Sequence, residues 1–293
     1  MTVLHVVPGL TEQWNGIAVA AKLLSKEQGA QCVEIKDVSR REIQNADEVW
    51  VHSCWTPCVW RVCSLVIRAH KRLVRMPHGN LDLVRLKYHG WKKRLVGPIE
   101  RHFLRKASRI VATCEAEKGW IETYLGKHCP PVEVTDIKRF FDFSRAERVD
   151  RVDGEGMGSR IERGKRVDGK LHLLYLGRQH PLKGLEYLKE AVKGIEGVEL
   201  RVVSNAFGEE KDKVWDWCDV LVLPTLSENF GLVIAEALER GKRVITTDGA
   251  PAWGDGNDYG GRLIYIRGFR NSSINVRVAL LTDHIKRAIH GLR

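Results

Sequence analysis

The chain has 293 residues, of which 43% are hydrophobic, and its 48 Lys and Arg residues outnumber its 37 Asp and Glu residues, a formal net charge of +11. No run approaches the roughly 18 apolar residues that a membrane-spanning helix needs, which excludes a chain built of such helices. No secretory signal opens the sequence, so we expect a cytoplasmic protein. The positive charge favours an anionic partner: nucleic acid, a membrane surface or an acidic acceptor.

Strands and helices alternate through the first half of the chain. Apolar, β-branched runs predict strands, and apolar residues at spacings of three and four, as at Ile17, Ala20 and Leu24, predict helices. The predicted strands cover residues 3–7, 48–52, 73–76 and 109–112, and the predicted helices cover 16–28, 60–72 and 90–107. Such alternation is typical of a parallel sheet with helices on both faces.

The alternation resumes after a segment in which glycine and charged residues dominate. We assign residues 146–170 to an exposed linker or loop, between an N-terminal domain over 1–145 and a second domain over 171–270. A closing helix takes up 271–293. The predicted strands of the second domain cover residues 171–176, 198–203 and 219–223, with helices over 185–193 and 212–217.

Two acids, Glu228 and Glu236, bracket seven residues where a strand passes into a helix. We expect this helix to start near Asn229, which places Glu236 two turns along it. Both acids would lie at or near the carboxyl edge of a parallel sheet, where ligands bind in open α/β folds. The first N–H groups of the helix, around Gly231, would favour an anion there.

This acid pair, with Phe-Gly between its members, resembles the signature of the retaining, nucleotide-sugar-dependent glycosyltransferases of GT-B type, which include the family 4-like and group 1 transferases. Three further stretches resemble the family's motifs in the family's order: MPHG at 76–79, LYLGRQHPLKG at 174–184 and TTDGAPAW at 246–253. The resemblance implies an α/β chain with two Rossmann-like domains facing a cleft, the N-terminal domain for the acceptor and the second domain for the nucleotide-sugar donor. It also implies transfer of a hexose from a nucleotide-sugar donor to a glycan or lipid-linked acceptor, as in the synthesis of lipopolysaccharide or another surface polysaccharide.

The resemblance extends to individual residue roles. Arg178 and Lys183 would bind the diphosphate, and Glu228 would hold hydroxyls of the sugar. Glu236 would hold the ribose, because a carboxylate accepts two hydrogen bonds from a vicinal diol. The catalytic set would be His78, Arg178, Lys183 and Glu228, and the donor would further contact Gly16, Asn229, Phe230 and Gly231.

We expect neither a cofactor nor a metal, since the nucleotide-sugar is a substrate and the chain contains no Asp-any-Asp triplet. His52, Cys54, Cys58 and Cys63 lack the paired spacing of a zinc site, and reduced thiols are expected for all seven cysteines.

A basic segment at 85–106 carries aromatic and aliphatic residues among its Lys and Arg side chains. This composition suits an anionic membrane surface or a polyanionic glycolipid, so we expect peripheral attachment to the inner face of a membrane. The residues assigned to this membrane or acceptor surface are Trp91, Lys92, Lys93 and Arg94.

Two alternatives remain open at this point. A nucleotide-sugar epimerase of the same two-domain architecture would convert the sugar without an acceptor. A nucleic-acid-binding protein would account for the charge, but the chain carries no recognisable binding motif for it. Two departures from the family's pattern bear on the donor: Asn15 and Gly16 stand where two glycines are common, and the second domain is shorter by one strand and helix.

Overall fold

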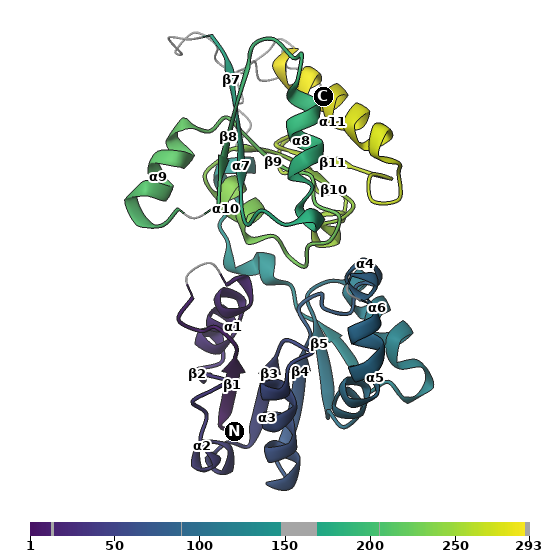
Figure 1. The fold of residues 1–293 in the computed structure, drawn as a ribbon. Helices are drawn as coiled ribbons and strands as arrows, with labels where there is room; N and C mark the ends of the chain where they lie inside the picture. The colour runs from purple at the N-terminus through teal and green to yellow at the C-terminus, as the bar shows by residue number, and fades with distance from the viewer. Residues whose placement is uncertain (13–14, 89, 148–168, 205, 291–293) are drawn as a thin grey trace. The chain divides into compact units, whose positions relative to one another are not determined.

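The computed structural model describes residues 1–12, 15–88, 90–147, 169–204 and 206–290 (Figure 1). Contacts between residues divide the chain into two compact units, Met1–Phe140 and Phe141–Arg293. Each unit contains one parallel sheet with helices, which confirms the predicted α/β class. The domain bounds drawn from the sequence stay predictions, and most of the linker assigned to 146–170 lies outside the described residues.

The first unit is built on a six-stranded sheet in the order β2-β1-β3-β4-β5-β6, in which all pairs are parallel. Side chains of β1 and β3 are buried on both faces, as expected for central strands of such a sheet. The strands are β1 (Val3–Val7), β2 (Gln31–Glu34), β3 (Glu48–His52), β4 (Arg72–Met76), β5 (Arg109–Ala112) and β6 (Val132–Val134).

The helices of the first unit begin at residues that cap them. Asn15 accepts a hydrogen bond from Ile17 N at the start of α1, and Thr56 caps α3 with Pro57 in its first turn. The helices are α1 (Gly16–Glu27), α2 (Arg40–Asn45), α3 (Pro57–Arg68), α4 (Leu83–Lys87), α5 (Gly90–Arg105) and α6 (Glu115–Leu125).

The second unit is built on a five-stranded parallel sheet in the order β11-β10-β9-β7-β8. Its strands are β7 (Leu171–Leu176), β8 (Val198–Val203), β9 (Val220–Leu223), β10 (Arg243–Thr247) and β11 (Leu263–Ile266). The helices are α7 (Ser144–Glu147), α8 (Leu185–Val192), α9 (Gly208–Trp217), α10 (Leu232–Glu239) and α11 (Ile274–His290). α11 packs against α8, as Figure 1 shows.

The expected start of the helix after β9 is wrong. α10 begins at Leu232, three residues later than Asn229, because Gly231 precedes it in a left-handed conformation with φ of 75°. Glu228, Asn229 and Phe230 therefore belong to a loop, and Glu236 lies just over one turn into the helix.

Candidate functional site

Three loops meet at the carboxyl edge of the second sheet. They follow β7, β9 and β10, which are neighbours in the sheet and run in the same direction. β8 pairs with one side of β7 and β9 with the other, so the strand order reverses between the loop after β7 and the loop after β9. Ligands of open α/β sheets bind at such a point.

The loop after β7 is bound directly to the loop after β9. The carbonyl of Leu182 accepts hydrogen bonds from Leu226 N at 2.8 Å and Thr225 Oγ1 at 3.0 Å. Gly184 has φ of 70°, and a Cβ at this position would lie 1.9 Å from the carbonyl oxygen of Pro224. Only glycine fits this contact, which fixes the position of Lys183 relative to the loop after β9, which carries Glu228.

The loop after β10 supports the loop after β9 from its other side. A Cβ on Gly249 would lie 2.0 Å from the carbonyl oxygen of Thr225, so the two backbones touch. Glu228 N donates to the carbonyl of Gly249 at 2.7 Å, and the indole N–H of Trp253 donates to the carbonyl of Phe230. The backbone that carries Glu228 is thus held by both of its neighbours.

The structure brings Lys183 and Glu228 together. Lys183 Nζ forms an ion pair with Glu228 Oε2, and Glu228 Oε1 accepts from Asn229 N at 3.2 Å. Both charged side chains are mostly buried, at 16% and 15% exposure. An ammonium group has three donors, so Lys183 can contact a phosphate and keep Glu228 in place.

Arg178 contributes an exposed cation to the same edge. Its carbonyl accepts a hydrogen bond from the buried Tyr175 hydroxyl at 2.9 Å, which fixes the backbone after β7. Its guanidinium has no charged partner in the part of the chain that the structure describes. This side chain can therefore bind an anion without breaking an existing ion pair.

Phe230 and Gly231 act through their backbone. The Phe230 ring is buried and packs against Phe141 and Trp253, with ring centroids 5.9 and 5.3 Å apart. No side chain caps α10 after Gly231, so the first N–H groups of this helix are open to an anion.

Glu236 lies on α10 and is paired with a residue that the sequence pattern did not indicate. Its Oε2 atom is buried and makes no hydrogen bond of ordinary geometry, but lies 2.7 Å from Lys211 Nζ on α9. A ribose that binds Glu236 would meet Lys211 as well.

Gly16 and His78 belong to the first unit. Gly16 is the exposed first residue of α1, and Asn15 fixes the loop before it by donating to the carbonyls of Pro8 and Gly9. His78 follows β4 in a left-handed conformation with φ of 54°. Burial, with repulsion from His5, lowers the pKa of His78 to about 3, so its imidazole is neutral near pH 7.

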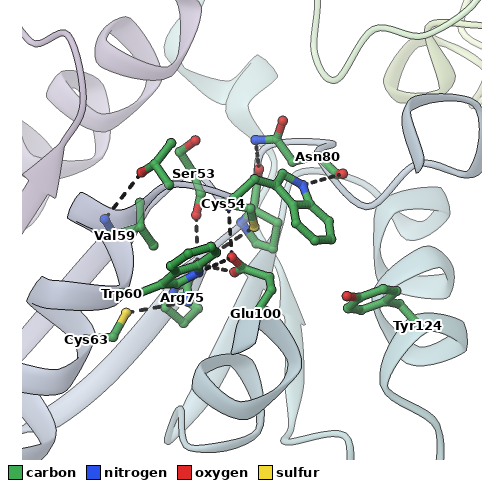
Figure 2. Close-up of polar contacts among 12 residues, drawn as sticks. Ser53, Cys54, Val59, Trp60, Cys63, Arg75, Asn80, Glu100 and Tyr124 are labelled. Carbon is green, nitrogen blue, oxygen red and sulfur yellow. Dashed lines mark hydrogen bonds and ion pairs between the residues drawn. The ribbon is translucent and has the colours of Figure 1, made fainter. Parts of the chain in front are cut away.

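A buried ion pair holds the loop after β3 (Figure 2). Arg75 and Glu100 lie 2.9 Å apart and are fully buried. Arg75 donates to the carbonyl of Ser53, and Glu100 accepts from Trp55 N and from the Trp60 indole. Ser53 and Trp55 both have positive φ, a strained conformation that requires such support.

The same loop is tied to the turn that follows His78. The Trp55 indole donates to the carbonyl of Asn80 at 3.1 Å. Since Glu100 belongs to α5, the inner face of this helix positions the carboxyl edge of the first sheet. The sequence offered one signal for this network, Arg75 between the apolar residues Val74 and Met76 of β4.

The outer face of α5 is apolar. Trp91, Leu95 and Ile99 are 68%, 75% and 44% exposed, and they follow one another at four-residue spacing. Lys92 and Arg94 flank them and are exposed. We call these five residues the α5 surface.

Lys93, which the sequence also assigned to this surface, is turned inward. It is partly buried, donates to the carbonyl of Arg85, and lies 5.8 Å from the centre of the Trp55 ring. Burial lowers the pKa of its ammonium group.

The described residues form neither a membrane-spanning helix nor a metal-binding cluster. None of their helices is both long and apolar enough to cross a membrane. They also contain no group of three or more His, Cys, Asp or Glu residues able to hold a metal ion. All seven cysteines are free thiols.

Two family models match consecutive parts of the chain. The model described as Glycosyltransferase Family 4 matches residues 17–145, and the model described as Glycosyl transferases group 1 matches residues 159–265. No curated protein matches the chain.

Solved structures share the fold at low sequence identity. HepE (Alr3699) of Anabaena is 14% identical with a TM-score of 0.62, over 98% of this chain and 90% of that one. Sucrose-phosphate synthase of Thermosynechococcus elongatus is 12% identical with a TM-score of 0.65, over 100% and 91% of the two chains. A trehalose-phosphate synthase of Burkholderia vietnamiensis is 9% identical with a TM-score of 0.61, over 99% and 92%. With both family models and this fold in agreement, the chain belongs to the group 1 glycosyltransferases of GT-B type and is a nucleotide-sugar-dependent enzyme.

Proposed function

We propose that the protein is a retaining hexosyltransferase that extends a glycan or lipid-linked acceptor in the synthesis of lipopolysaccharide or another surface polysaccharide. The observation that carries the proposal is the arrangement at the carboxyl edge of the second sheet. Arg178, Lys183 and the uncapped start of α10 supply positive charge there, and Glu228 stands beside Lys183. This combination fits a diphosphate with a sugar attached to it.

A uridine nucleotide is the first donor to test. The Anabaena HepE structures are described as complexes with UDP and glucose and with UDP-glucose, and the Burkholderia synthase is described as UDP-forming. Those ligands belong to those proteins. The proteins share their fold with this chain over nearly its whole length.

In the proposed reaction, the bond between the anomeric carbon and the diphosphate oxygen breaks, and its electron pair stays on the diphosphate. Arg178 and Lys183 stabilise the negative charge that develops there; removing one such fixed donor typically costs about 2.7 to 4 kcal/mol. The acceptor hydroxyl attacks from the same face, and its proton passes to the leaving phosphate. The products are a glycoside of retained configuration and a nucleoside diphosphate, with positive side chains in the place of a metal.

The acceptor proposal depends on the α5 surface. Exposed apolar side chains flanked by cations match an anionic bilayer, in which apolar anchors enter the interface and basic groups meet lipid phosphates. We therefore propose that the α5 surface docks on an anionic membrane leaflet, where a lipid-linked acceptor is found.

Vesicle binding tests this docking. Reversing Lys92 and Arg94 to Glu should weaken binding to anionic vesicles, by about 1 kcal/mol for each basic side chain removed from the membrane surface. Reversal of Lys26 and Lys213, which are exposed outside α5, is the matched control for total charge. Equal losses in the two double variants, or no binding of the parent protein, would remove the membrane from the proposal.

Thermal shift measurements test the donor site. A ligand that binds the folded state raises the melting temperature, so UDP, GDP, ADP, CMP and their sugars can be ranked directly. We expect one nucleotide and its sugar to stabilise the protein. Stabilisation by oligonucleotides alone would favour nucleic-acid binding, and conversion of the sugar without an acceptor would favour an epimerase.

A further inference from the structure

Three buried histidines form a continuous chain of hydrogen bonds across the first sheet. His5 lies in β1, His52 ends β3 and His78 follows β4, and these strands are neighbours. His5 Nδ1 lies 2.9 Å from His52 Nε2, and His52 Nδ1 lies 2.8 Å from His78 Nε2. The rings are also stacked, with centroids 5.2 and 5.1 Å apart.

We call these three hydrogen-bonded rings the histidine row. At one end of the row is Gln28, which follows α1. The side-chain carbonyl of Gln28 lies 2.9 Å from His5 Nε2. At the other end, Nδ1 of His78 makes no hydrogen bond with any described residue. The row therefore runs from an exposed amide to one ring nitrogen at the carboxyl edge of the first sheet.

All three rings are neutral near pH 7. Burial lowers the pKa of His5, and burial together with repulsion from His78, His5 and Arg75 lowers the pKa of His52 far below its usual value. A neutral imidazole carries one N–H, and its other nitrogen accepts. Each N···N contact in the row thus has one donor and one acceptor.

The tautomers of a row of neutral imidazoles are linked. A carbonyl oxygen only accepts, so His5 donates from Nε2 to Gln28 and must accept at Nδ1. His52 then donates from Nε2 and accepts at Nδ1, and His78 donates from Nε2. The consequence is an unprotonated Nδ1 on His78.

We propose that Gln28, acting through His5 and His52, sets the tautomer of His78 so that its Nδ1 is presented to the substrate as a hydrogen-bond acceptor. A sugar hydroxyl is the group that such a nitrogen recognises, because it can donate. The contact between His78 Nδ1 and the substrate rests on the proposed glycosyl transfer. The linked tautomers of the three histidines do not depend on it. Gln28, His5 and His52 are positioning residues, and none of them needs to touch the substrate.

Substitution of Gln28 should reverse the direction of every hydrogen bond between the three histidines. Arginine offers only donors, so Gln28→Arg requires His5 Nε2 to accept, and each ring in turn then changes its tautomer. His78 would present an N–H at Nδ1 in place of a lone pair. Gln28→Met removes the polar end and should leave a mixture of both directions. Residue 28 is exposed, so both variants should fold.

Nitrogen-15 NMR of the histidine rings reads the tautomers directly and needs no substrate. We expect protonated Nε2 and unprotonated Nδ1 on all three rings of the parent protein, and the reverse in Gln28→Arg. Gln31→Arg places the same charge on an exposed residue outside the row and should leave the rings unchanged. A protonated Nδ1 on His78 in the parent protein, or unchanged rings in Gln28→Arg, would overturn the proposal.

Kinetics with a nucleotide-sugar donor tests the substrate contact. A hydroxyl can accept as well as donate, so it would turn to meet an N–H at His78 Nδ1, and its own proton would then lose its acceptor. An unsatisfied buried polar group costs about 1 to 3 kcal/mol, so Gln28→Arg should lower kcat/KM about five- to 150-fold while Gln31→Arg does not. Reversed rings with normal kcat/KM would overturn the role of His78 Nδ1 in binding the sugar. A parent protein that transfers no sugar but shows the linked tautomers would overturn the proposed function and leave the row standing.

Discussion

At the scale of single residues, the ion pair between Lys183 and Glu228 is the feature that most constrains the donor site. Both side chains are mostly buried, so removing either one leaves a partly desolvated charge behind. Arg178 differs, since it is exposed and forms no ion pair with a described residue. The two cations should therefore respond differently to substitution although both are proposed to bind phosphate.

We expect Arg178→Ala and Lys183→Ala to lose most turnover, by about a hundredfold each, because each removes a charge aimed at the leaving diphosphate. Lys183→Ala should also lower the melting temperature, since Glu228 loses its partner, whereas Arg178→Ala should not. Steady-state kinetics and calorimetry measure both effects. Lys189→Ala, which removes an exposed cation from α8, is the matched control. Full activity in both site variants would remove the phosphate site.

The two acids are proposed to bind different parts of the donor, Glu236 the ribose and Glu228 the sugar. Glu236→Ala is expected to weaken binding of the free nucleotide, because its carboxylate is proposed to hold the ribose. Glu228→Ala should weaken binding of the nucleotide-sugar more than that of the free nucleotide. Calorimetric titration with both ligands measures this difference. Equal losses for the two ligands in both variants would contradict separate roles.

At the scale of structural elements, the site depends on close contacts between loops. Gly184→Ala would place a Cβ against the Pro224 carbonyl, whereas Gly194, with φ of 74°, faces open space. Both substitutions strain a left-handed residue, so the difference between them isolates the contact. We expect Gly184→Ala to destabilise the protein by at least about 2 kcal/mol more than Gly194→Ala, measured by urea unfolding. Similar stabilities would show that the two loops move apart freely.

The histidine row makes the first unit sensitive to acid. The pKa of each of these histidines is lower in the folded protein than in the unfolded chain, so the unfolded chain binds more protons below about pH 6.5. Their contribution to stability is complete above that pH and is lost as the pH falls. For each histidine whose pKa in the folded protein is far below its usual value, the free energy of unfolding should fall by about 1.4 kcal/mol for each pH unit below about 6.5.

Amide hydrogen exchange in β1 and β3 at pH 7.5 and 5.5, corrected for intrinsic rates, reports this loss for the first unit. Glu117 opposes it, because burial raises the pKa of its carboxyl group and acid then favours the folded state. Glu117→Gln should therefore steepen the loss. Equal or higher protection at pH 5.5 in that variant would contradict a row of neutral buried histidines.

In the first sheet, the sequence predicted the central strands better than the edges. β1 and β3 are mostly apolar because both of their faces are buried, and such runs are easily recognised. β2 and β6 were missed, since they lie at the edges of this sheet and carry polar, partly exposed side chains. In the second sheet the sequence predicted β8, which lies at an edge, but missed the central strand β10 and the edge strand β11. An edge strand pairs on one side only and needs no apolar run.

The candidate site was predictable where residues close in sequence carry it. The loop with Glu228 and Gly231 was found in this way, whereas Lys211 and Gln28 were not, because their partners lie far along the chain. The start of α10 was misplaced because the sequence alone does not show that Gly231 takes the left-handed conformation that precedes the helix. A histidine in each of two apolar strands was the available signal for the row.

At the scale of the whole molecule, the two units carry different parts of the proposed reaction. The second unit holds the cations and acids proposed to bind the donor, and the first holds His78, Gly16 and the α5 surface. Two family models of glycosyltransferases match the two parts in this order. Together, we propose, the two units transfer a sugar from a nucleotide with retention of configuration.

Proton NMR of the first product formed from a nucleotide-hexose and a glycan acceptor tests for this transfer and for its stereochemistry. We expect a new glycosidic bond with the donor's anomeric configuration, formed at an undiminished rate in EDTA, because Arg178, Lys183 and the start of α10 carry the charge of the leaving group. An inverted anomer would contradict the retaining mechanism. Activity that EDTA abolishes and magnesium restores would contradict the role given to these positive groups.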